Sequence, residues 1–299
     1  MSLNKFILCV IGLGALGSPV IKKAAKLGFS EVRVIDGDVI SEKNRINQSL
    51  YRDFDISKPL FKSDAIVSML SREYSNTKFL SFPEYATETN IDSLIGGADL
   101  VLDFTDNTLT RLIINKACVK KSIPLFIGSI NDSAGFYYLI SNAACFNCIY
   151  KNASSRMKEG CDSNQPIPPE SFVDEIVARI VDIKNGVEEP EFVSLRFDSG
   201  EKVSTKLSKD PLCSVCSLGD YSPIKTDNFI QVCGDGIKFS AQREIDILKL
   251  RDSIGGEIID GKTYLLRASG KSILISRLGD CLFTGYSKEG AQKFIDAYL

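Results

Sequence analysis

The hydrophobic pattern of the first half of the chain switches repeatedly between two periods. Short apolar runs of strand length occur at residues 6–11, 31–36 and 98–105. Between them, in residues 16–27 and 62–73, apolar positions recur every three or four residues, as on one face of a helix. Strands that alternate with helices predict a mostly parallel sheet with helices on both faces. We therefore expect an α/β, Rossmann-like domain.

The alternation continues beyond the middle of the chain. Further helices are predicted at 110–121 and 170–184, and further strands at 78–82, 124–130, 135–141, 191–197 and 202–207. Residues 151–169 are polar and contain Gly160 and three prolines, which predicts an exposed loop.

The last part of the chain no longer shows the regular alternation of strands and helices. Helices are predicted at 241–253 and 288–299, and strands at 262–267, 272–276 and 281–283. We interpret residues 1–216 as the Rossmann-like domain and residues 217–299 as a small C-terminal α+β domain.

Composition narrows the possible partners. The formal net charge is −2, whereas proteins that bind nucleic acid or a membrane surface usually carry a basic excess. The sequence has no run of 18 apolar residues and no signal-peptide pattern at its start. We therefore expect a cytoplasmic protein that binds neither nucleic acid nor membrane.

The chain has nine cysteines and no histidine. An odd number of cysteines in a cytoplasmic protein argues against a disulfide framework. Without histidine the usual general base is missing, so catalysis must use carboxylates, amines, thiols, metal ions or electrostatic stabilisation.

A glycine-rich turn follows the first predicted strand. Gly12, Gly14 and Gly17 have the spacing Gly-x-Gly-x-x-Gly, and Asp36 ends the second strand about 20 residues later. Such glycines let the backbone approach phosphate at a helix N-terminus, and the acid can accept a hydrogen bond from a ribose hydroxyl. Alone, this motif indicates a nucleotide and would favour NAD.

Two Cys-x-x-Cys pairs lie far apart in the sequence, at Cys145/Cys148 and Cys213/Cys216. Each pair can bind one side of a tetrahedral Zn²⁺, and four thiolates leave no open position for catalysis. We predict a structural zinc site; the alternative is that one pair is redox-active or that both are idle. Four other cysteines are predicted to be packing residues, namely Cys9, Cys118, Cys233 and Cys281.

Polar residues follow the strand predicted at 98–105. Asp106 and Asn107 come at its carboxyl end, where open α/β sheets bind ligands, and Arg111 and Asn115 follow on the next helix. Asp106 could hold Mg²⁺ together with phosphate oxygens. Capping of that helix by Asp106 or Asn107 is the structural alternative, and both roles can coexist.

The order of these motifs resembles a known family. GLGALG, IDGDVISEKN, DLVLDFTDNTLTR, PLFIGS and the two cysteine pairs are similar to the ThiF/MoeB-type adenylyltransferases, relatives of ubiquitin-activating enzymes, over residues 6–216. The resemblance implies an enzyme that binds ATP·Mg²⁺ and the Gly-Gly tail of a ubiquitin-like or sulfur-carrier protein. The tail carboxylate would attack the α-phosphate, giving an acyl-adenylate and pyrophosphate. A carboxylate is already ionised at pH 7, so no strong base is needed.

The resemblance also assigns roles to single residues. The glycines match the family's nucleotide loop and Asp106 its Mg²⁺-linked acid, with Asn107 beside it. The remaining nucleotide contacts would come from Asp36 at the ribose, Asp38 as a second acid, Asn44, and Lys62 as the phosphate lysine, with Lys58 as its rival.

The chain departs from the family at one catalytic position. Asn47 stands where the family has an arginine, and Arg45 or Arg52 is expected to replace that arginine. Cys161, in the predicted loop, matches a family cysteine that joins covalently to the carrier; the alternative is an ordinary exposed thiol.

We interpret the chain as an ATP-dependent adenylyltransferase with structural zinc, and we expect a homodimer. A second hypothesis is a catalytically reduced, regulatory or substrate-binding member of the same fold. A third is an NAD-dependent oxidoreductase. Exchange between ATP and pyrophosphate separates the first two, and a titration with NADH against ATP tests the third. The sequence does not identify the carrier or its pathway.

Overall fold

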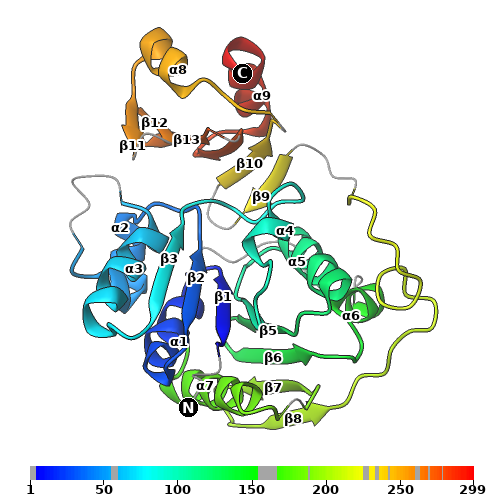
Figure 1. The fold of residues 1–299 in the computed structure, drawn as a ribbon. Helices are drawn as coiled ribbons and strands as arrows, with labels where there is room; N and C mark the ends of the chain where they lie inside the picture. Colours follow the sequence, from blue (N-terminus) through cyan, green and yellow to red (C-terminus); the bar gives the residue numbers. More distant parts are fainter. Residues whose placement is uncertain are drawn as a thin grey trace. The chain divides into compact units, whose positions relative to one another are not determined.

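The computed structural model describes residues 5–54, 60–153, 167–187, 189–224, 229–232, 236–241, 243–259, 263–268, 270–277 and 279–299 (Figure 1). These residues divide into two compact units, the first ending at Pro223 and the second beginning at Ile224. Each unit has its own sheet and its own hydrophobic core.

The first unit is built on an eight-stranded sheet in the order β3-β2-β1-β4-β5-β6-β7-β8. The first five strands of this order are parallel and the last three are antiparallel. The predicted mostly parallel sheet is therefore confirmed. The strands are β1 (Ile7–Ile11), β2 (Glu31–Ile35), β3 (Lys78–Phe82), β4 (Leu100–Asp103), β5 (Leu125–Ile130), β6 (Ala134–Ile140), β7 (Phe192–Arg196) and β8 (Lys202–Thr205).

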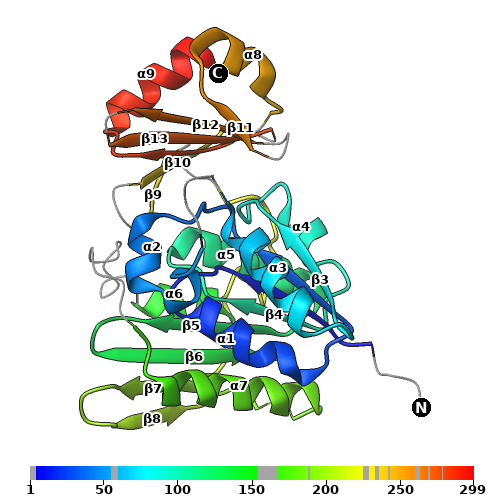
Figure 2. The ribbon, with the colours of Figure 1, turned by 90° about the vertical axis from the view of Figure 1, so that its left-hand side faces the viewer.

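Helices cover both faces of this sheet (Figure 2). The longer ones are α1 (Gly17–Ala24), α3 (Lys62–Glu73), α5 (Thr108–Lys121), α6 (Phe146–Ala153) and α7 (Glu170–Lys184). Shorter helices include α2 (Glu42–Asn47), the 3-10 helix η2 (Ser49–Tyr51) and α4 (Ile91–Leu94). The loop predicted at 151–169 was wrong for its first three residues, because they form the end of α6.

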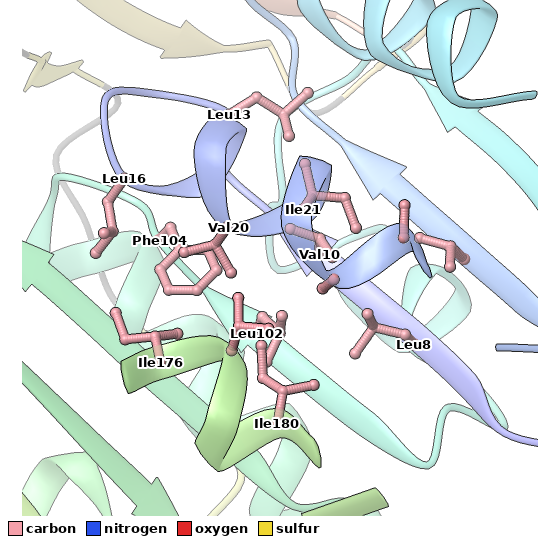
Figure 3. Packing of buried hydrophobic residues seen from close by; sticks show 14 of the residues in the cluster. Leu8, Val10, Leu13, Leu16, Val20, Ile21, Leu102, Phe104, Ile176 and Ile180 are labelled. Atoms are coloured by element: carbon pink, nitrogen blue, oxygen red, sulfur yellow. The ribbon is translucent and has the colours of Figure 1, made fainter. Parts of the chain in front are cut away.

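The main core lies where α1 and α7 pack on the parallel strands. Figure 3 shows Val20 of α1 and Ile176 of α7 beside Leu102 of β4. All three side chains are buried. Successive strand residues point to opposite faces, so Leu8 and Val10 join this core while the intervening Cys9 faces the carbonyl of Leu94 in α4.

The second unit is a six-stranded antiparallel sheet in the order β11-β12-β13-β14-β10-β9. Its elements are β9 (Phe229–Val232), β10 (Gly236–Ser240), α8 (Ile247–Ile254), β11 (Glu257–Ile259), β12 (Thr263–Ala268), β13 (Lys271–Ser276), β14 (Asp280–Thr284) and α9 (Lys288–Tyr298). The predicted α+β class is confirmed, although β9, β10 and β11 were missed. Helix α8 starts later than predicted because Asp246 caps it by accepting from the Lys249 amide at 3.0 Å.

Some predictions fall outside the described residues, namely those on Lys58, Cys161 and Cys233 and on the side chain of Asn47. Cys9, Cys118 and Cys281 are buried, which confirms their packing role. Among the described residues, no helix combines the length and the apolar character that crossing a membrane requires.

Candidate active site

The order in which strands are added to the sheet reverses between β1 and β4. After β1 the chain builds β2 and β3 on one side and then returns to place β4 on the other side, with Ile11 of β1 in register with Asp103 of β4. The loops that leave the carboxyl ends of these two strands diverge, which is where open α/β sheets bind ligands. Six residues that follow these strands and β2 form what we call the switch-point cluster, namely Gly12, Gly14, Asp36, Asp38, Lys62 and Asp106.

The three glycines of the predicted loop differ in whether and why the structure requires glycine there. Gly12 has φ +93°, and a Cβ there would lie 2.8 Å from the backbone carbon of Phe104. A Cβ at Gly17 would lie 2.0 Å from the carbonyl oxygen of Gly12, so the helix can only start here with glycine. Gly14, by contrast, faces open space. Packing therefore does not require glycine at Gly14, whereas close approach of a phosphate to the backbone would.

Two backbone amide groups fix the carboxylate of Asp36 after β2. Its Oδ2 accepts from the Leu13 amide at 2.7 Å and its Oδ1 accepts from the Asp38 amide at 2.8 Å. Burial and the nearby Asp38 carboxylate raise the pKa of Asp36 to about 6. Each carboxylate oxygen has a second lone pair that can accept from a hydroxyl group.

Lys62 and Asp38 form an ion pair at the start of α3. The ammonium Nζ lies 2.8 Å from Asp38 Oδ2, and Lys62 is only 3% exposed. Burial opposes the charge, but the carboxylates of Asp38, Asp36 and Asp106 outweigh it and hold the pKa of Lys62 above its usual value. The buried side chain of Lys62 is therefore a charged ammonium inside the switch-point cluster, as a lysine that binds phosphate would be.

The loop that carries Asp106 is fixed by its neighbours. Asp103 Oδ1 accepts from both the amide and the hydroxyl of Thr105, at 2.9 and 2.6 Å. The Arg111 guanidinium donates to the carbonyls of Thr105 and Gly128. Asp106 itself is exposed, and its charge acts on Lys62. The structure therefore brings Asp106 and Lys62 together and gives Arg111 a structural role in holding the loop.

Asn107 and Asn44 both have capping roles. Asn107 Oδ1 accepts from the Thr110 amide at 2.8 Å and caps α5, as the structural alternative proposed. Asn44 forms a reciprocal capping box with Ser41 at the start of α2. In both residues the carbonyl oxygen makes the cap, so the side-chain NH₂ still offers donors to a ligand.

Arg45 and Arg52, the two candidates to replace the family's arginine, lie close together. Arg45 Nε donates to the backbone carbonyl of Arg52 at 3.0 Å, and its Nη1 lies 3.2 Å from Glu42 Oε2. The pair with Glu42 is largely exposed, and such pairs contribute little to stability. The Arg52 side chain is exposed.

The sequence analysis missed two tyrosines at this site. The hydroxyl of Tyr51, which is fully buried, donates to the Leu13 carbonyl at 3.0 Å and supports the glycine-rich turn. The hydroxyl of Tyr85 donates to Asp38 Oδ1 at 2.8 Å. Tyr85 follows the carboxyl end of β3. Its position after a third parallel strand was the one feature of the sequence that could have indicated a place at this site.

The four predicted metal ligands meet in one cluster. Their sulfur atoms all lie within 4.8 Å of one another, with Cys145 and Cys213 separated by 3.7 Å and Cys148 and Cys216 by 3.4 Å. A tetrahedral zinc with Zn–S bonds of about 2.3 Å requires S···S separations of about 3.8 Å. None of the four is in a disulfide. The cysteine cluster, defined by these four residues, therefore has the dimensions of a zinc site.

Burial and hydrogen bonding fix the residues of this cluster in place. Cys145 is 0% exposed and Cys148 is 4% exposed. Burial raises the pKa of the Cys148 thiol to about 11, whereas a divalent cation favours the thiolate. Asn115 holds the start of α6 at the cluster, because its Oδ1 accepts from the Phe146 amide at 2.9 Å and its Nδ2 donates to Asn147 Oδ1. Asn115 therefore has a structural role.

A parallel sheet with a glycine-rich turn after its first strand and an acid after its second defines a nucleotide-binding protein of the Rossmann-like class. The chain belongs to the ThiF family, whose model matches residues 2–216. The resemblance predicted from the sequence is thus confirmed.

Relatives in the family carry names that agree with the predicted enzyme class. The chain is 26% identical over 294 residues to the sulfur carrier protein ThiS adenylyltransferase of Bacillus subtilis, covering 92% of this chain and 87% of the relative. It is 24% identical over 243 residues to the SAMP-activating enzyme E1 of Haloferax volcanii, covering 75% and 85%. The crystal structure of MccB from E. coli shares the fold with a TM-score of 0.59 at 21% identity, covering 72% of this chain and 67% of that one.

Proposed function

We propose that this protein is an ATP-dependent adenylyltransferase that activates the C-terminal glycine of a ubiquitin-like or sulfur-carrier protein. The observation that carries the proposal is the switch-point cluster, which combines a glycine turn that is open at Gly14, the fixed carboxylate of Asp36 and the buried ammonium of Lys62. Family membership and the names of the relatives support the same chemistry.

The residues divide the work as follows. The backbone around Gly14 and the N-terminus of α1 would receive phosphate oxygens, because free amide groups and the helix dipole favour anions there. Asp36 would accept a ribose hydroxyl, and Lys62 would neutralise phosphate charge. Asp106 would hold Mg²⁺, which supplies further charge neutralisation when bound.

The reaction needs alignment more than acid–base chemistry. An oxygen of the ionised tail carboxylate forms a bond to the α-phosphorus while the bond from that phosphorus to the bridging oxygen breaks, and pyrophosphate leaves with that electron pair. The negative charge that develops requires fixed cations and dipoles rather than a base. This agrees with a chain that contains no histidine.

The test is ATP–pyrophosphate exchange in the full chain, with the ThiS protein of Bacillus subtilis as a probe and ThiS lacking its last two residues as the control. We expect labelled pyrophosphate to enter ATP only with intact ThiS. Binding of ATP without exchange would favour the regulatory or substrate-binding hypothesis. Tight binding of NADH without ATP binding would overturn the assignment in favour of the oxidoreductase.

Four finer assignments belong to this proposal. Arg45 would replace the family's missing arginine, so Arg45→Ala should reduce exchange more than Arg52→Ala; the reverse order would reassign the role to Arg52.

Cys161 would form a covalent link to the carrier, which intact-mass measurement with Cys161→Ala as control would detect or exclude. The cysteine cluster would hold one Zn²⁺. A homodimer is expected in solution, and a monomeric mass by light scattering would contradict it.

A further inference from the structure

Asp38 is held from two sides by groups of different character. Lys62 Nζ lies 2.8 Å from Asp38 Oδ2, and the Tyr85 hydroxyl donates to Asp38 Oδ1 at 2.8 Å. The Asp38 side chain is 41% exposed, whereas the Lys62 side chain is 4% exposed. A partly exposed carboxylate with a second anchor keeps one rotamer, and through it the direction of the lysine ammonium.

Tyr85 is itself firmly placed. A Cβ at Gly37 would lie 3.0 Å from atoms of the Tyr85 ring, so the ring packs closely on the backbone between the two acids. The Tyr85 carbonyl accepts from Asn90 Nδ2 at 2.8 Å, and Asn90 Oδ1 accepts from the Thr87 amide at 2.8 Å. The loop after β3 is therefore tied to itself, and the hydroxyl of Tyr85 has a defined position over Asp38.

We propose that Tyr85 is a positioning residue for phosphate binding, acting through Asp38 on the Lys62 ammonium. It touches neither the reacting carboxylate nor the phosphorus. Without its hydroxyl, Asp38 can turn and take the ammonium with it, so that less of the lysine's charge is directed at the phosphates. The inference rests on the proposed function, because it assumes that Lys62 binds phosphate.

The role predicts an effect that depends on the phosphates of the ligand. Tyr85→Phe keeps the ring against Gly37 and removes only the hydroxyl. We expect the affinity for ATP·Mg²⁺ to fall about three- to tenfold, the size of effect typical of one lost hydrogen bond. The affinity for adenosine, which has no phosphate, should stay within about twofold because Lys62 does not contact it. A general structural defect would lower the affinity for ATP and for adenosine by the same factor.

The experiment measures both ligands on the full chain by competition against a fluorescent ATP analogue. The matched control is Tyr74→Phe, since the Tyr74 hydroxyl also donates to a carboxylate, Glu73 Oε1, at 2.8 Å but lies at the far end of α3. This control should bind ATP and adenosine as the wild type does. In an Asp38→Ala background, Tyr85→Phe should have no further effect, because the two residues act in series.

The outcomes separate the two proposals. If the wild type binds ATP and Tyr85→Phe binds it equally well, the positioning role is wrong and the proposed function stands. Equal losses for ATP and adenosine would also overturn the positioning role. If the wild type binds neither ligand, the proposed function itself fails. A loss for ATP alone, absent in the Asp38→Ala background, supports the inference.

Discussion

The switch-point cluster and the cysteine cluster lie in the same unit but are built in opposite ways. In the first, charged side chains are oriented by their neighbours, as Lys62 is by its ion pair with Asp38, and a Cβ at Gly14 would face open space. In the second, four thiols converge within 4.8 Å, and three of them are buried. The difference suits two kinds of site: the open backbone at Gly14 suits a ligand that comes and goes, whereas four converging thiols suit a closed structural metal site.

The largest expected effect comes from removing a cysteine ligand. Cys213→Ser should lose the metal and most of the folded protein, because structural zinc contributes about 10–16 kcal/mol of apparent binding free energy. Elemental analysis and thermal unfolding measure both. Cys118→Ala is the control: it alters a cysteine that is 1% exposed but outside the cluster, and should keep one zinc per chain. A zinc-free wild type with the same stability would contradict the structural role.

The next effect should be confined to the switch-point cluster. Asp106→Ala should lower ATP–pyrophosphate exchange by about a hundredfold or more, since a charge-organising group is lost. The melting temperature should not change, because Asp106 is exposed. Asp132→Ala, at another exposed acid, should retain exchange. Exchange retained in Asp106→Ala would refute the role assigned to Asp106.

Two glycines of one turn should respond differently. Gly17→Ala should impair folding, because its Cβ would collide with the Gly12 carbonyl oxygen. Gly14→Ala should fold normally and bind ATP about tenfold more weakly, since the methyl group fills the space left for a phosphate. Thermal unfolding and ATP titration compare the two variants. Equal stability for both, or unchanged ATP binding by Gly14→Ala, would break the distinction.

The smallest effect is a pH dependence. The pKa of Asp36 is about 6, so its carboxylate ionises as the pH rises through 6 and becomes a better acceptor for a ribose hydroxyl. Adenosine should therefore bind more tightly at pH 7 than at pH 5, by about threefold. Adenosine is the suitable probe because ATP phosphates titrate in the same range, and the chain has no histidine to add a second transition. Binding independent of pH would exclude Asp36 as the ribose acid.

Local chemistry made much of the first unit predictable. The glycine turn, the acid after β2 and the Cys-x-x-Cys pairs carry fixed spacings, because a tight turn, a ribose contact and a metal ligand pair each restrict nearby residues. The predicted strands of the parallel sheet were present for a similar reason: buried strands are almost continuously apolar. In the second unit the predicted strands β12, β13 and β14 were present, whereas the short strands β9, β10 and β11 were missed.

The sequence by itself determined the nucleotide motif, the mostly parallel sheet and the identity of the four cysteines. Only the tertiary structure decided that Asp38 pairs with Lys62, that Tyr85 reaches Asp38, and that Arg111 and Asn115 bind backbone groups. Spacing along the chain restricts residues a few positions apart, whereas these contacts join separate elements. The contacts of Asp38 form only when β2 and β3 lie side by side in the sheet, and the contact of Asn115 forms only when α5 and α6 pack together.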